Sequence, residues 1–329
     1  MHMADALLSP VVSGGMAIAA ATTATYAYRS ISRNIEDTKI PLMGVMGAFI
    51  FAAQMINFTI PGTGSSGHIG GGMLLAILLG PYAGFLTISA VLLIQALFFG
   101  DGGLMALGAN IINMGFFTCL IAYPLIYRPL IDKWQGKFSK QLVTVFAVVV
   151  GLQMGAFSVV LETLLSGKTE LPFMRFVLLM LPIHLAIGLV EGLITAAVLA
   201  FVLKDRPELL NNNAKSSSPS KGVLITMLVI TLIVGGGLSL YASSHPDGLE
   251  WSIAKVTGET ELASNGALFD FFASIQEKTA VLPDYDFKVS DSGVISGTTV
   301  SGIVGAAMTL LLTICIATFI RKTRKNKKA

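Results

Sequence analysis

The first two residues, Met1 and His2, can chelate a metal ion with very little help from the rest of the chain. An unblocked terminus of this type offers three nitrogens: the α-amine of Met1, the deprotonated backbone amide of His2 and the His2 imidazole. Together they close two fused chelate rings in a square plane, a geometry that suits divalent nickel or copper and not tetrahedral zinc. One more nitrogen completes the plane, and the chain has only three other histidines to supply it.

The composition indicates what kind of molecule presents this terminus. Hydrophobic residues make up 53% of the chain, charged residues 12%, and the mean hydropathy is +0.75. Soluble domains carry about 25% charged residues, so this is a polytopic membrane protein. The net charge of +3 gives no reason to expect a nucleic-acid partner. Cys119 and Cys315 both sit in apolar runs and are interpreted as small hydrophobic residues, not as a disulfide or a metal pair.

Apolar runs long enough to cross a bilayer, about 20 residues each, predict an all-α integral membrane protein. One region, residues 70–99, is ambiguous because Gly80-Pro81 interrupts a thirty-residue apolar stretch with a helix breaker. The other runs are residues 10–28, 40–58, 105–127, 142–165, 173–203, 222–242 and 299–320.

The distribution of Lys and Arg decides how often residues 70–99 cross, because cytoplasmic loops collect these residues. Two crossings give nine spans and place most of the 22 basic residues inside. One crossing instead moves every loop after residue 99 to the opposite side of the membrane. We therefore expect two short helices there, tilted or shielded within the bundle. The N-terminus then lies outside the cell and the C-terminus in the cytoplasm. The first run has no basic residue before Arg29 and is interpreted as a true span, not as a cleavable signal peptide.

This topology identifies His68 as the fourth nitrogen. His68 lies in the loop of residues 61–72, PGTGSSGHIGGG, on the same outer side as the N-terminus. The other two histidines are less suitable, since His184 falls inside a span and His245 belongs to a later external segment. The glycines of the loop allow the backbone to approach a ligand or another chain segment closely. Met1, His2 and His68 are therefore the predicted metal-binding residues.

Two motifs with other meanings are rejected. Residues 62–67 match the dinucleotide fingerprint G-x-G-x-x-G, but they join two membrane spans and do not belong to a βαβ unit. Residues 167–169, Gly-Lys-Thr, lack the earlier glycine of a phosphate-binding loop, because that position holds Glu162. The chain accordingly has no ATPase signature of its own, and it has no zinc-protease or haem motif.

Three polar residues leave alternatives open. His184 and Glu191 are seven residues apart and share a helix face, so they form either a proton or ion relay or ordinary polar pairs across helices. The same pair is the basis of a competing hypothesis, an integral membrane metalloenzyme, for which the sequence has no catalytic signature. Asp5 either braces the N-terminus by a hydrogen bond or lies in solvent.

The predicted organisation has three parts. Residues 1–204 form a bundle of about seven helices, and residues 205–221, rich in Asn, Ser and Pro, form a cytoplasmic linker. Residues 222–329 form a two-helix unit around an external, acidic segment of about residues 243–297, which makes a small extracytoplasmic domain.

Three stretches carry a family resemblance. MHMADALLSP at the start, GTGSSGHIGGG around His68 and HLAIGLVEG at residues 184–192 resemble the substrate-capture (S) components of energy-coupling-factor nickel and cobalt transporters, the NikM/CbiM family. The similarity covers residues 1–203, and the opening is closer to the nickel branch. HPDGLE at residues 245–250 resembles the small auxiliary subunit of the same transporters, NikN or CbiN, here fused to the first part.

The resemblance implies a function. In such a protein Ni(II) is the transported substrate, held with high affinity at the outer face by the Met1 amine, the His2 amide and imidazole, and His68. The chain is then not an enzyme but part of an ATP-driven uptake system in a prokaryotic (inner) cell membrane. It works with a transmembrane coupling (T) subunit and two ATP-binding-cassette ATPase subunits. Co(II) is the alternative substrate, although nickel binds more tightly at equal geometry. No ligand role is assigned to residues 246–250.

Overall fold

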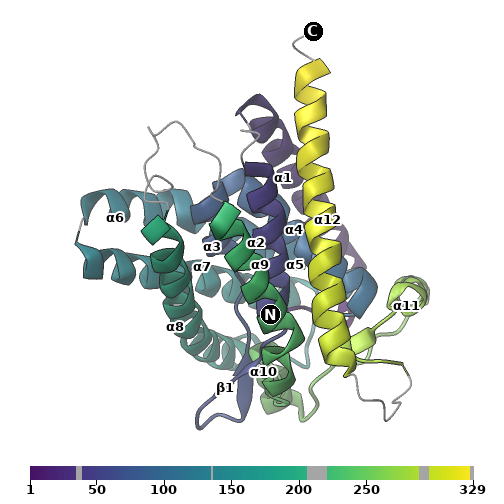
Figure 1. Cartoon of the computed structure of the whole chain (residues 1–329). Helices are drawn as coiled ribbons and strands as arrows, with labels where there is room; N and C mark the ends of the chain where they lie inside the picture. The colour runs from purple at the N-terminus through teal and green to yellow at the C-terminus, as the bar shows by residue number, and fades with distance from the viewer. Residues whose placement is uncertain (35–38, 135, 206–220, 289–295, 327–329) are drawn as a thin grey trace.

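The computed structural model describes residues 1–34, 39–134, 136–205, 221–288 and 296–326. Within these ranges the protein is a bundle of helices with one short two-stranded hairpin (Figure 1), so the predicted all-α membrane fold is confirmed. Up to residue 205 the helical elements are η1 (Asp5–Leu7), α1 (Pro10–Asn34), α2 (Lys39–Gln54), α3 (Gly72–Leu79), α4 (Pro81–Ile94), η2 (Gln95–Phe99), α5 (Leu107–Ile111), η3 (Ile112–Tyr127), α6 (Arg128–Lys133), α7 (Lys137–Leu165) and α8 (Phe173–Asp205).

The C-terminal segment, residues 221–288 and 296–326, adds two long helices and several short ones. These elements are α9 (Lys221–Gly236), η5 (Leu238–Tyr241), α10 (Gly248–Thr257), α11 (Ala267–Thr279), η6 (Pro283–Tyr285) and α12 (Gly297–Asn326). The predicted linker lies outside the described residues except at its two ends. The boundaries of the predicted domains are likewise not fixed by the structure.

All nine expected crossings are helices, but they differ in length. Six in the described part of the chain are long and apolar enough to span a bilayer: Pro81–Phe99, Leu107–Lys133, Lys137–Leu165, Phe173–Val202, Lys221–Tyr241 and Gly297–Thr323. Helix α1 has 25 residues but carries Ser, Thr and Tyr side chains, and α2 has only 16 residues.

The ninth helix, α3, departs most from a full crossing. Its eight residues rise about 12 Å, well short of the roughly 30 Å hydrocarbon core. Gly80 ends the helix with a φ of 90°, and Pro81 starts α4 at the first helical position. Every residue of α3 is buried, as expected for a short helix shielded within the bundle.

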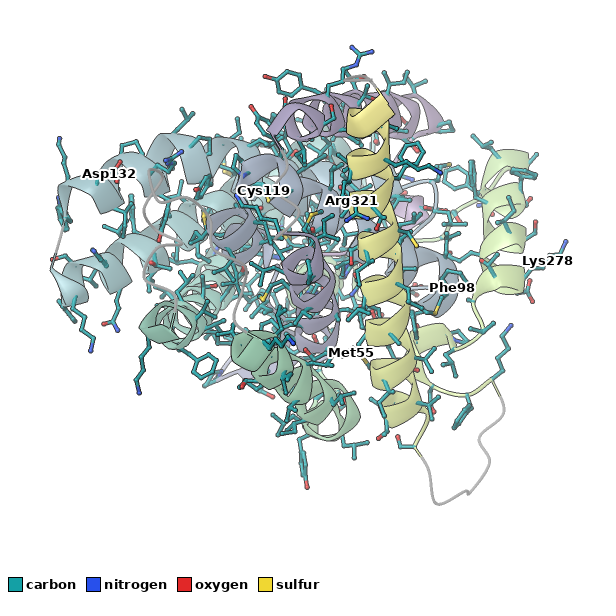
Figure 2. All side chains as sticks on the ribbon, turned by 45° about the horizontal axis from the view of Figure 1, so that its top comes forward. Met55, Phe98, Cys119, Asp132, Lys278 and Arg321 are labelled. Carbon is teal, nitrogen blue, oxygen red and sulfur yellow. The ribbon has the colours of Figure 1, made fainter. Side chains whose placement is uncertain are left out.

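The C-terminal segment is packed against the first part of the chain. Helices α9 and α12 both lie on α2, and α10 lies on α8. A Cβ at Gly44 would come within 2.7 Å of Ile314 Cγ1, so glycine allows α2 and α12 to approach closely. Cys119, within the packed helices of Figure 2, is buried and Cys315 is exposed, and both are free thiols.

The small hairpin brings distant segments to one end of the bundle. Strands β1 (Phe58–Ile60) and β2 (Ser65–Gly67) pair antiparallel, with Thr59 opposite Ser66. The hairpin and α10 lie at one end, and the C-terminal end of α12 lies at the other (Figure 1). Residue 68 follows β2 directly, so the hairpin sets the position of His68.

Candidate metal centre

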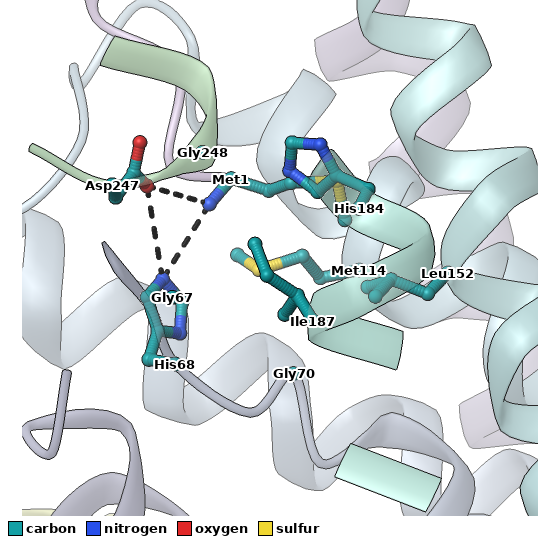
Figure 3. Close-up of a pocket in the computed structure, with 10 residues that line it drawn as sticks. All are labelled: Met1, Gly67, His68, Gly70, Met114, Leu152, His184, Ile187, Asp247 and Gly248. Carbon is teal, nitrogen blue, oxygen red and sulfur yellow. Dashed lines mark hydrogen bonds and ion pairs between the residues drawn. The ribbon is translucent and has the colours of Figure 1, made fainter. Parts of the chain in front are cut away.

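The structure brings Met1, His2 and His68 together. The Met1 amine nitrogen lies 3.5 Å from Nε2 of His68 (Figure 3), and the rings of His2 and His68 stack with centroids 5.0 Å apart and planes inclined by 17°. Their side chains are only 3%, 7% and 8% exposed. The amine and both imidazoles of the predicted site therefore lie in one buried cluster.

The terminal segment is anchored along its length. Asn110 receives a hydrogen bond from Met3 N at 2.7 Å and donates one to Met3 O at 3.2 Å, and Gly103 N donates to the same oxygen at 2.9 Å. Oδ1 of Asp5 accepts a hydrogen bond from Ala106 N at 2.8 Å. Asp5 thus braces the N-terminus, which was the first of the two alternatives. These bonds hold the chain end inside the bundle although its first four residues form no regular structure.

His68 presents the correct nitrogen to the amine. Its Nδ1 lies 3.1 Å from the carbonyl oxygen of Ile69, so Nδ1 carries the proton and Nε2 keeps its lone pair facing Met1. Burial, and then the nearby Met1 ammonium, lower the pKa of His68 to about 3. The same two causes lower the pKa of His2 to about 3. Both imidazoles are consequently neutral near pH 7, the form that binds metals.

Glu191 holds the loop that carries His68. Its two carboxylate oxygens accept hydrogen bonds from Gly70 N and Gly71 N, each at 2.9 Å, and Gln54 Nε2 donates to Gly70 O at 2.8 Å. Gly71 has a φ of 78°, a conformation that strains other residues. Both oxygens of Glu191 therefore have a structural partner across helices.

His184 uses a different partner from Glu191. Its Nδ1 lies 2.8 Å from the carbonyl oxygen of Met180, and its Nε2 has no hydrogen-bond partner. The ring lines a small cavity of about 10 Å³ together with Met1, His68 and Asp247 (Figure 3). His184 and Glu191, considered above as a relay, therefore bond to different partners. His184 lines the same cavity as Met1.

Two carboxylates that sequence reasoning did not assign complete the cluster. Asp247 Oδ2 lies 2.9 Å from the Met1 amine and 4.0 Å from His68 Nε2, and Asp101 Oδ1 lies 3.1 Å from His2 Nδ1. Burial opposes ionisation of Asp247, but the adjacent ammonium outweighs it and keeps the pKa of Asp247 below its usual range. Burial raises the pKa of Asp101. The sequence signals were the P-D-G-L-E motif and an acidic residue directly after an apolar run.

A larger hollow of about 430 Å³ adjoins these residues. His2, His68 and Asp247 line it, while His68 and Asp247 also line the small inner cavity. Its acidic lining consists of Asp5, Asp101, Asp247, Glu250, Glu261 and Asp284. The terminal cluster thus borders both an acidic hollow, which attracts cations, and the small cavity.

Side chains alone do not form a metal site here. In the part of the chain that the structure describes, no group of three or more His, Cys, Asp or Glu residues is arranged to hold a metal ion. The predicted site adds main-chain nitrogens of the terminus, which suit a square-planar ion.

Comparison with known proteins identifies the family of the chain. Residues 2–209 match the family described as cobalt uptake substrate-specific transmembrane region, and residues 221–322 match the PDGLE domain. A putative fused nickel transport protein NikMN of Archaeoglobus fulgidus is 32% identical over 98% of this chain and 99% of its own. A cobalt transport protein CbiM of Sorangium cellulosum is 33% identical over 52% of this chain and 76% of its own.

Solved structures show the same fold over part of the chain. The crystal structure of a transition metal transporter superposes with a TM-score of 0.56 and 31% sequence identity, covering 62% of this chain and 93% of that one. The related proteins and the fold are those of metal transporters, not enzymes, so the metalloenzyme hypothesis is discarded. The chain belongs to the CbiM family of nickel and cobalt transport proteins, with a CbiN-like PDGLE domain fused to its C-terminal side.

Proposed function

We propose that this protein captures Ni(II) with four nitrogens from three residues: the Met1 amine, the His2 amide and Nδ1, and the His68 Nε2. The observation that carries the proposal is the 3.5 Å approach of the Met1 amine to His68 Nε2, with the His2 ring stacked beside them. Nickel is favoured because relatives that match most of the chain are named as fused nickel transport proteins.

Capture of nickel at the outer membrane face would be the first step of its uptake. The hairpin that precedes His68 and α10 lie at one end of the bundle and the C-terminal end of α12 lies at the other, which supports a site on the opposite side of the membrane from the C-terminus (Figure 1). As the substrate-specific component of an energy-coupling-factor transporter, the chain would act with a T subunit and two ATPase subunits.

Co(II) is the second candidate substrate, because the family of residues 2–209 and several relatives carry cobalt names. The same nitrogen set can bind either ion, and the magnetism of the two complexes distinguishes them. A low-spin square-planar Ni(II) complex is diamagnetic and yellow, whereas Co(II) in the same plane remains paramagnetic. Competition between the two ions on the purified protein measures the preference.

The decisive experiment places two glycines before Met1, because a single glycine would create a Gly-Met-His terminus that chelates nickel by itself. The extended chain keeps every side chain but loses the amine at its required position, so high-affinity nickel binding and the yellow absorption should disappear. Two glycines added after Ala329 are the matched control and should leave both unchanged. Retained nickel binding in the N-terminally extended protein would rule out the terminal chelate.

A further inference from the structure

The turn before α10 has a structural role that accounts for its acidic residues. Asp247 is the N-cap of α10: its Oδ1 accepts hydrogen bonds from Leu249 N at 2.8 Å and Glu250 N at 2.9 Å. Oε2 of Glu250 accepts a hydrogen bond from Asp247 N at 2.9 Å, which completes a capping box. These bonds occupy one oxygen of Asp247 and leave the other oxygen free.

That second oxygen reaches the other end of the chain. Asp247 Oδ2 lies 2.9 Å from the Met1 amine, a contact between residues 246 positions apart (Figure 3). Ser, Thr or Asn would also cap the helix, but none of them supplies a second, negatively charged oxygen. The cap alone therefore does not explain why aspartate stands here.

Contacts that do not involve Met1 fix the position of this carboxylate. Ser66 N donates to Pro246 O at 2.8 Å, and Trp251 Nε1 donates to Thr63 O at 2.9 Å. A Cβ at Gly248 would lie 2.9 Å from Ile187 Cδ1 and 3.1 Å from His184 Cε1, so the turn packs tightly on α8. The turn is thus docked on the first part of the chain, and the carboxylate is presented to the terminus.

The Met1 amine depends on this single counter-charge. Among the described residues Asp247 is the only carboxylate paired with it, and the Met1 side chain is 3% exposed. Removing one partner of a buried ion pair leaves an uncompensated charge, which is strongly destabilising. A terminus without its carboxylate would be driven toward solvent.

We propose that Asp247 is the positioning residue that seats the Met1 amine, so that the C-terminal segment completes a metal site built otherwise from the first part of the chain. This inference deepens the proposed function and rests on it for its consequence in nickel binding. Charge balance is consistent with it. Ni(II) adds two positive charges while the Met1 ammonium and the His2 amide each lose a proton, so the net charge beside Asp247 is the same before and after binding.

Chemical labelling of the amine tests the proposal without any metal. The full-length protein with its native terminus, freed of metal by a chelator, is reductively methylated in detergent, and the N-terminal peptide is followed by mass spectrometry. The exposed Lys278 serves as the internal reference. Asp247→Asn keeps a capping side chain but removes the charge, and Met1 should then be modified at least about tenfold faster relative to Lys278.

Two further variants make the test specific. Glu250→Gln weakens the capping box but leaves the Asp247 carboxylate in place, so Met1 should stay as protected as in the wild type. Gly248→Ala keeps the carboxylate but displaces the turn from Ile187 and His184, so Met1 should become reactive. If Met1 of Asp247→Asn is modified as slowly as in the wild type, Asp247 does not seat the terminus.

Nickel titration separates this proposal from the proposed function. Loss of a residue that orients a ligand typically weakens metal affinity by about tenfold or more, so Asp247→Asn should bind nickel about tenfold more weakly with an unchanged absorption spectrum. Wild-type protein that binds no nickel would overturn the proposed function, while the labelling result would still decide the role of Asp247. Unchanged nickel affinity in Asp247→Asn would show that holding the Met1 amine in place does not contribute to nickel binding.

Discussion

Asp101 Oδ1 lies 3.1 Å from Nδ1 of His2, the same ring nitrogen that the proposed terminal chelate would use. Only Nδ1 closes a six-membered ring with the backbone amide of its own residue, since Nε2 is on the far side of the imidazole. In the metal-free arrangement Asp101 therefore holds the ligand nitrogen, just as Asp247 holds the Met1 amine. Nickel would have to displace Asp101 from Nδ1, whereas a Met1 amine bound to nickel keeps N–H groups that still donate to Asp247.

Asp101→Ala tests this competition. The polar contact between Asp101 and His2 must break when nickel binds in the proposed way, and such a contact is worth about 1 kcal/mol, or roughly a fivefold factor. We expect the variant to bind nickel about fivefold more tightly in calorimetric titration. A tenfold loss of affinity would show instead that Asp101 supports the bound state.

His68→Ala should remove the fourth nitrogen of the plane. Loss of a residue that merely orients a ligand costs about 10- to 100-fold in metal affinity, so loss of the ligand itself should cost more than about 100-fold. The visible absorption should shift as well, because water replaces nitrogen. His245→Ala is the matched control: His245 is exposed and has no contact with the cluster, and its loss should change neither quantity. Equal effects of the two substitutions would place the fourth ligand elsewhere.

The number of protons released on nickel binding follows from the state of the two imidazoles. The pKa values of His2 and His68 are lowered to about 3, so neither ring carries an extra proton between pH 5 and pH 8. Release should be close to two protons, one from the Met1 ammonium and one from the His2 amide, and affinity should rise with pH. Calorimetry in buffers of different ionisation enthalpy counts these protons. One proton would exclude the amide as a ligand, and three or more would show that the rings are charged in the empty site.

The sequence was sufficient for much of this architecture because apolar run length and Lys/Arg placement are local properties. All nine expected helices are present, and the shielding of residues 72–79 followed from the Gly80-Pro81 break. The meeting of Met1, His2 and His68 was inferred from their shared side of the membrane. Asp247 and Asp101 were not found, because their roles depend on how α10 docks on α8 and on the hairpin, a long-range contact with no sequence period.

The role of Glu191 also depends on a long-range contact that the sequence does not show. Its position on a shared face with His184 suggested a relay, whereas its carboxylate clamps Gly70 N and Gly71 N beside His68. Glu191→Gln turns one acceptor oxygen into an N–H donor, which faces a backbone N–H and breaks one arm of the clamp. His68 is then less well oriented, and nickel affinity should fall by about 10- to 100-fold.

A second buried carboxylate supplies the control for this experiment. Glu162 accepts hydrogen bonds from Asn113 and Ser158 at 2.9 Å each and has no contact with the His68 loop, so Glu162→Gln should leave the nickel affinity within about threefold of the wild type. Transport assays with both variants add a second readout. If Glu191 were part of a proton relay, Glu191→Gln would abolish uptake while leaving nickel binding intact. Weakened binding in Glu191→Gln alone assigns Glu191 to the support of His68.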